Sequence, residues 1–141
     1  MSQLPNRDIE RCTESSCRDR PSFFRWASKT PPPPDRGEIG RAAWKFLHTM
    51  AANFPDEPTK EEAERQARWM GAFTRLYPCH ICRQGFEEII EKMPPKVTDR
   101  ANFALWMCEA HNEVNKDISL PTVECKADEL LKLRTDYPTD L

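Results

Sequence analysis

Two cysteines follow a proline near the middle of the sequence, in the run Pro78-Cys79-His80-Ile81-Cys82. Pro78 suits the start of a helix, so we expect the cysteines at a helix N-terminus. The partial positive charge there stabilises a thiolate, and two cysteines at this spacing can close a small, reducible disulfide. Zinc sites use the same spacing. The pair alone therefore indicates redox chemistry, a passive disulfide or a metal site.

A second group of chemically active side chains comprises Cys108, His111, Asn112 and Asn115. Because these positions are three or four residues apart, they share one face of a helix. A face with a sulfur, an imidazole and two carboxamides is costly to bury unless it meets a polar partner. A heterocyclic cofactor with many hydrogen-bond acceptors would be such a partner.

Trp44 and His48 form a third, aromatic and hydrogen-bonding stripe, and Arg41 on the same expected helix could meet a phosphate. Taken singly, Trp44 is more typical of a core aromatic and His48 of a satisfied or surface histidine. The remaining cysteines are Cys12, Cys17 and Cys125. Spacing does not settle how the six cysteines pair.

These side chains must be positioned by helices. From Asp35 onward apolar residues recur at helical spacing, and prolines or capping residues mark the helix ends. No alternating strand pattern appears. We therefore predict an all-α fold, a four-helix bundle plus a short fifth helix, with helices over about residues 35–53, 59–76, 79–92, 98–116 and 126–133.

Residues 1–35 contain six of the thirteen prolines and show no sustained helical period. We interpret them as a flexible, Pro-rich tail that ends in a polyproline II spacer. An extended spacer would let Cys12 and Cys17 reach a site up to about 55 Å away. The folded domain is expected at 36–134 and a C-terminal tail at 135–141.

Composition narrows the function classes. The net charge of −2 argues against nucleic-acid binding, and no apolar run approaches the roughly 20 residues that cross a membrane. The N-terminus lacks the apolar core of a secretory signal, and its acidic residues fit poorly with a transit peptide. Paired cysteines in a chain without a leader favour redox or metal chemistry over a secreted scaffold.

Three motifs in this order resemble the Erv/ALR family of FAD-linked sulfhydryl oxidases. They are the segments Gly40–Thr49, Tyr77–Cys82 and Trp106–Lys116. The resemblance covers roughly residues 36–134, and three ordered motifs are far more specific than one.

The resemblance implies an FAD-dependent oxidase that forms disulfides in protein dithiols and passes electrons through Cys79 and Cys82 to FAD, and then to oxygen or cytochrome c. Cys82 would be the sulfur nearest the flavin, and Cys79 the sulfur attacked by substrate. Cys108 and Cys125 would form a structural disulfide. The implied FAD-binding residues are Gly40, Arg41, Trp44, His48, Tyr77, Cys108, His111, Asn112, Val114, Asn115 and Lys116.

Members of the family often carry a shuttle pair on a flexible arm, commonly C-x-x-C when it is N-terminal. Here Cys12 and Cys17 form a C-x4-C candidate that would pass electrons to Cys79–Cys82, within or between subunits. The resemblance further implies a homodimer and a protein dithiol or folding-pathway oxidoreductase as partner. It implies the mitochondrial intermembrane space, or alternatively another oxidising compartment such as the ER lumen.

Three positions depart from the family pattern. Asn53 stands where a Tyr is common, Asp117 where many members carry Lys, and Leu131 where many carry Trp. We expect altered contacts to the adenine and phosphate groups, where Lys116 or Lys126 could supply a cation. The relay from sulfur to flavin is untouched by these changes.

The main alternative is a zinc-binding helical interaction module. Cys79, Cys82, Cys108 and His111 would form an acceptable tetrahedral donor set. This reading leaves Cys125 unpaired and gives Trp44 and His48 no role. A helical scaffold with incidental disulfides is a third possibility, and it predicts no cofactor and no thiol oxidation.

Overall fold

The computed structural model describes residues 32–136, which form two pairs of long helices and a short helical segment. The long helices are α2 (Arg36–Ala52), α3 (Lys60–Leu76), α4 (His80–Lys92) and α5 (Arg100–Asp117). The short segment consists of α6 (Ala127–Leu130) and the 3-10 helix η2 (Leu131–Leu133). No strand occurs within residues 32–136, so the predicted all-α class and the five helices are confirmed.

Local capping explains where α3 and α5 begin. Thr59 Oγ1 accepts a hydrogen bond from the Glu62 backbone at 3.1 Å, and the Glu62 carboxylate accepts one from the Thr59 backbone at 2.7 Å. This is a complete capping box. At α5, Asp99 accepts from the Asn102 backbone at 2.8 Å, and this bond lowers the pKa of the Asp99 carboxyl. Both caps use residue types that favour the start of a helix.

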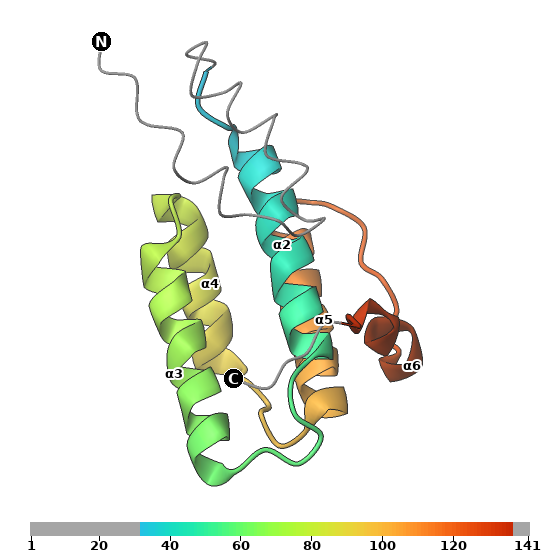
Figure 1. Ribbon diagram of the computed structural model, residues 1–141. Helices are drawn as coiled ribbons and strands as arrows, with labels where there is room; N and C mark the ends of the chain where they lie inside the picture. The colour runs from blue at the N-terminus through green and yellow to red at the C-terminus, as the bar shows by residue number, and fades with distance from the viewer. Residues whose placement is uncertain (1–31, 137–141) are drawn as a thin grey trace, which may run out of the picture. The chain divides into compact units, whose positions relative to one another are not determined.

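The core lies where α5 packs against α2 and α4. Phe103, Trp106 and Met107 on α5 are fully buried, together with Met70 on α3. The Trp106 indole donates to the Met93 carbonyl at 2.9 Å, so its polar atom is satisfied inside the core. The α3–α4 pair therefore packs on one side of the α2–α5 pair (Figure 1).

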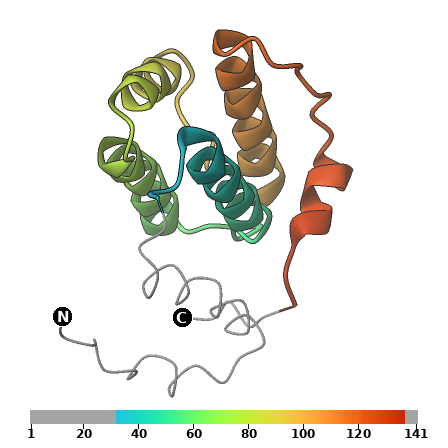
Figure 2. The same cartoon turned by 90° about the horizontal axis from the view of Figure 1, so that it is seen from above.

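A segment that we call the C-terminal strap, residues 118–136, continues from α5 and includes α6 and η2. Ser119 has φ 59°, a left-handed conformation that lets the chain turn back after the helix. The strap then runs along the side of the α2–α5 pair that faces away from α3 and α4 (Figure 2). Its η2 end packs on α2, so the strap bridges two helices.

Among residues 32–136, no helix is both long enough and apolar enough to span a membrane.

Candidate functional site

The Cys79–Cys82 pair forms a disulfide at the corner between α3 and α4. Cys79 is the N-cap of α4, and its sulfur accepts a hydrogen bond from the Cys82 backbone at 3.4 Å. The backbone N–H groups and positive end of α4 stabilise negative charge on this sulfur. Cys82 is exposed and Cys79 is half-buried, so external thiols can approach the bond. This arrangement suits thiol–disulfide exchange.

Tyr77 connects this corner to the start of α2. A Cβ added at Gly40 would lie 3.8 Å from the Tyr77 hydroxyl, so the phenol rests beside an α2 position without a side chain. Burial raises the pKa of Tyr77, which keeps the phenol neutral and able to donate a hydrogen bond. Two predicted cofactor residues therefore meet near the Cys79–Cys82 disulfide.

An aromatic cluster joins α2 to α5. The ring of Trp44 stacks on that of His111, with centroids 3.9 Å apart and an interplanar angle of 6°. His48 Nε2 lies 2.8 Å from His111 Nδ1, a hydrogen bond that requires one nitrogen to carry a proton and the other to lack it. The edge of Phe86 on α4 completes the cluster, 6.0 Å from the Trp44 centroid.

Both imidazoles in this cluster are held neutral. Burial, followed by repulsion from His111, lowers the pKa of His48 from 6.5 to about 4. Burial also lowers the pKa of His111. A neutral pair with linked tautomers offers one donor and one acceptor to a ligand at physiological pH. Such a pair suits a flat heterocycle that needs both.

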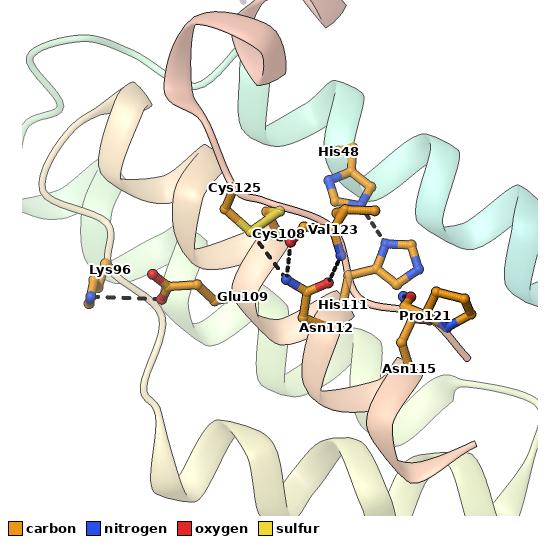
Figure 3. The surroundings of a disulfide bond; sticks show 10 residues. All are labelled: His48, Lys96, Cys108, Glu109, His111, Asn112, Asn115, Pro121, Val123 and Cys125. Atoms are coloured by element: carbon orange, nitrogen blue, oxygen red, sulfur yellow. Dashed lines mark hydrogen bonds and ion pairs between the residues drawn. A yellow bond between two sulfur atoms is a disulfide. The ribbon is translucent and has the colours of Figure 1, made fainter. Parts of the chain in front are cut away.

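The Cys108–Cys125 disulfide anchors the strap to α5, with Cα atoms 5.8 Å apart (Figure 3). Asn112 Nδ2 donates to the Val123 carbonyl at 2.8 Å, and Asn112 Oδ1 accepts from the Val123 N–H at 3.0 Å. Asn112 Nδ2 also lies 3.4 Å from Cys125 Sγ. The Asn112 carboxamide thus makes the same pair of hydrogen bonds to Val123 that the backbone of a neighbouring strand would make.

Asn115 extends this anchoring, because its Nδ2 donates to the Pro121 carbonyl at 3.2 Å. The polar face predicted for α5 is therefore real, but in this structure its two carboxamides bind the strap. Figure 3 shows His111 on the same side of α5, with Val123 and Pro121 beside it. The strap consequently forms a wall next to the histidine pair, and a role of Asn112 and Asn115 toward a cofactor stays a prediction.

The other predicted cofactor residues differ in their surroundings. Arg41 is exposed on α2, and Lys116 pairs with Glu113 on its own helix. Val114 packs against the core. Lys126 pairs with Glu124 at 3.0 Å. No contact in the structure therefore assigns a phosphate-binding role to Arg41, Lys116 or Lys126.

Sequence reasoning missed two contributors to this region. Phe86 touches Trp44 from α4, and no role was assigned to it from the sequence. Asn53 was identified solely as a departure from the family pattern, but it accepts hydrogen bonds from Thr135 across 82 residues. No short-range signal in the sequence links Asn53 to Thr135.

The zinc alternative is not supported. Cys79 and Cys108 are each in a disulfide with a different partner, so the proposed donors do not form a set of thiolates. Within residues 32–136, no group of three or more His, Cys, Asp or Glu side chains is placed to hold a metal.

The predicted shuttle residues Cys12 and Cys17 lie outside the described residues.

The sequence profile of the Erv1 / Alr family matches residues 41–138, which include both disulfides and the His48–His111 pair. The chain belongs to this family.

Curated members of the Erv1 / Alr family show the same relationship. The chain is 39% identical over 93 residues to the mitochondrial FAD-linked sulfhydryl oxidase ERV1 of Saccharomyces cerevisiae, which covers 66% of this chain and 49% of the relative. It is 43% identical over 88 residues to the FAD-linked sulfhydryl oxidase ERV2 of the same yeast, covering 62% and 45%. The chain thus spans about half the length of these curated relatives.

Solved structures confirm the fold. The yeast Erv1 core superposes with a TM-score of 0.66 at 37% identity, over 69% of this chain and 82% of that one. The FAD binding domain of Erv1 from Saccharomyces cerevisiae gives a TM-score of 0.66 at 35% identity, over 70% and 92%.

Proposed function

We propose that this protein is an FAD-dependent sulfhydryl oxidase that forms disulfides in protein dithiols. The carrying observation is the accessible Cys79–Cys82 disulfide at the N-cap of α4, in a chain of the Erv1 / Alr family. Support also comes from the relatives, whose names describe FAD-linked sulfhydryl oxidases.

The residues present fit a flavin dinucleotide. The stacked rings of Trp44 and His111 offer aromatic surface, and the neutral His48–His111 pair offers a donor and an acceptor. We assign the holding of FAD to these three residues first, with Tyr77 and Gly40 beside the redox disulfide. When bound, FAD would supply the two-electron acceptor that protein side chains lack.

The chain's own chemistry is disulfide exchange. A substrate thiolate attacks Cys79 Sγ, the bond to Cys82 breaks, and Cys82 leaves as a thiolate. A second substrate thiolate then attacks the mixed disulfide, which releases an oxidised substrate and leaves Cys79 and Cys82 reduced. Two electrons have entered the protein, Cys79 and Cys82 are left as thiolates, and the two protons lost when the substrate thiols ionised are in the solvent. The choice of Cys79 as the attacked sulfur rests on the family resemblance, since Cys82 is the more exposed residue.

The electron acceptor, the partners and the compartment belong to the same proposal. We infer oxygen or cytochrome c as the acceptor and a protein dithiol or folding-pathway oxidoreductase as the donor, with Cys12 and Cys17 as a shuttle pair. Relatives named as mitochondrial support the mitochondrion, and within it we propose the intermembrane space.

A homodimer is also proposed. Its support is an aromatic surface on α2 and α3, where Phe46 is 55% exposed and its ring lies 6.1 Å from that of Trp69. Phe73 stacks beside Trp69. Sedimentation equilibrium of the full chain tests this assignment, and a Phe46→Glu variant should shift the population to monomer. A wild-type protein that sediments as a monomer would contradict it.

The central test is spectroscopic. Purified full-length protein, or protein reconstituted with FAD, should show flavin absorbance near roughly 450 nm. Dithiothreitol added without oxygen should bleach this band, and admission of air should restore it. A colourless protein that refuses FAD, or a flavin band that dithiothreitol leaves unchanged, would refute the proposed activity.

A further inference from the structure

The end of α2 holds the far end of the C-terminal strap through one side chain. Asn53 follows the last residue of α2, and its Nδ2 donates to the Thr49 carbonyl at 2.7 Å. Its Oδ1 accepts from both the backbone N–H and the hydroxyl of Thr135, each at 3.1 Å. Asn53 is thus fixed on its own helix by one atom and grips the strap with the other.

The two halves of the strap are attached very differently. The first half is tied to α5 by the Cys108–Cys125 disulfide and by Asn112 and Asn115. For the half over residues 126–136, the Asn53–Thr135 bonds are the only hydrogen bonds to the long helices within the described part of the chain. Its short helix α6 has no side-chain cap. The second half therefore depends on Asn53 and on the packing of α6 against α5 and of η2 against α2.

The strap packs against α2 and α5, the same two helices that carry the candidate flavin site. His48 lies on α2 and His111 on α5, the two helices that the strap bridges. Val123, in the first half, lies beside the histidine pair (Figure 3). Opening the second half of the strap would leave only the disulfide end in place on this side of α2 and α5. A ligand held there would then be open to solvent on one flank.

We propose that Asn53 is a positioning residue that fastens the strap beside the His48–His111 site and thereby slows the release of bound FAD. This inference rests on the proposed function. It assigns Asn53 no contact with the flavin or with the reacting sulfurs. The effect is transmitted through Thr135, whose two donors Asn53 satisfies.

The first experiment measures the rate at which FAD leaves the full-length protein after dilution into apo-flavodoxin or another flavin-binding scavenger. Asn53→Ala should release FAD about tenfold faster than wild type, since it removes the two hydrogen bonds that close the strap. Hydrogen exchange of peptides over residues 118–136 should rise in the same variant. Dithiothreitol turnover per bound flavin, measured at saturating FAD, should stay unchanged.

Thr135→Val separates fastening from a general effect on the end of α2. This variant removes the hydroxyl donor but keeps the backbone N–H and leaves the Asn53–Thr49 bond intact. It should speed FAD release by about threefold, and the double variant should release no faster than Asn53→Ala alone, because both changes break one contact. Thr59→Ala, which removes the cap of α3 far from the strap, is the stability control and should leave FAD release at the wild-type rate.

The outcomes distinguish this inference from the proposed function. Wild-type protein that binds no FAD would overturn both. Wild-type protein that binds FAD, with an Asn53→Ala release rate equal to its own, would overturn the positioning role alone. Additive effects of the two substitutions, or an equal acceleration by Thr59→Ala, would likewise exclude a specific fastening by Asn53.

Discussion

The two disulfides of the described chain are chemically alike, but one lies at the protein surface and the other begins in the core. Cys79–Cys82 spans three residues at an exposed helix start, with its hydrogen bond supplied by its own turn. Cys108–Cys125 spans seventeen residues, and Cys108 is only 2% exposed in the core. Because the first bond lies within a single helical turn, we expect it to open and close while the bundle stays folded. The second joins a core helix to the strap, so we expect its loss to lower the stability of the fold.

The largest expected effect separates the two bonds by activity. Cys82→Ser should abolish dithiothreitol oxidation, because no disulfide then remains for a substrate thiolate to attack at α4. The flavin band near roughly 450 nm should persist, since the substitution leaves the Trp44–His111 cluster intact. Oxygen uptake and absorbance of the same sample measure both effects. Retained turnover would show that another cysteine pair carries the chemistry.

The second prediction concerns stability. Replacing Cys108 and Cys125 by Ala should lower the free energy of unfolding by about 3 kcal/mol, the chain-entropy value for a loop of this length. Chemical denaturation of protein with and without the pair measures the difference. The matched Cys79→Ala, Cys82→Ala variant removes a disulfide that closes a much smaller loop, so it should lose less stability. An equal loss in both would remove the distinction drawn between the bonds.

Much of this contrast was accessible from the sequence. Prolines and capping residues marked the helix limits, and helical spacing placed Cys108, His111, Asn112 and Asn115 on one face. These signals are local, so they survive without knowledge of tertiary contacts. The partners of that face were not accessible. Asn112 and Asn115 bind the backbone of the strap. Every residue has a backbone carbonyl, so the side-chain types of residues 118–125 do not indicate which carbonyl will accept the bond.

The histidine pair was likewise only half predicted. Helical spacing placed His48 on one stripe with Trp44 and His111 on the polar face of its helix, but their hydrogen bond depends on the register of α2 against α5. A shift of one residue between these helices would separate the rings. Long-range contacts of this kind, like Asn53 with Thr135, are decided by packing and leave no trace in spacing.

Acid should weaken the α2–α5 region in preference to the α3–α4 corner. The folded pKa of His48 is about 4 and lies below its ordinary value of 6.5, so between these values the unfolded chain binds a proton that the folded chain refuses. The free energy of unfolding should therefore fall as pH drops from about 6.5 to about 4. Thermal melting across this range measures it, and a His48→Gln variant should show a shallower dependence. A steeper one would contradict the assignment.

The smallest predicted effect tests how Asn112 supports the second disulfide. Asn112→Ala should cost about 1 kcal/mol of stability, because the freed Val123 groups are exposed and can bind water instead. In the background without Cys108 and Cys125, the same substitution should cost less, since the strap is already loose. Denaturant midpoints of the four proteins close this cycle. Full additivity would mean that the carboxamide and the disulfide act independently.

Helix α5 changes character along its length. Its residues from Phe103 to Ala110 are mostly buried, whereas those from His111 onward are partly or fully exposed. In a variant library of this helix scored for cellular abundance, we expect substitutions in the first half to lower abundance and many in the second half to leave it unchanged. Alleles in the second half that impair only the proposed cofactor binding would call for a screen that reads bound flavin.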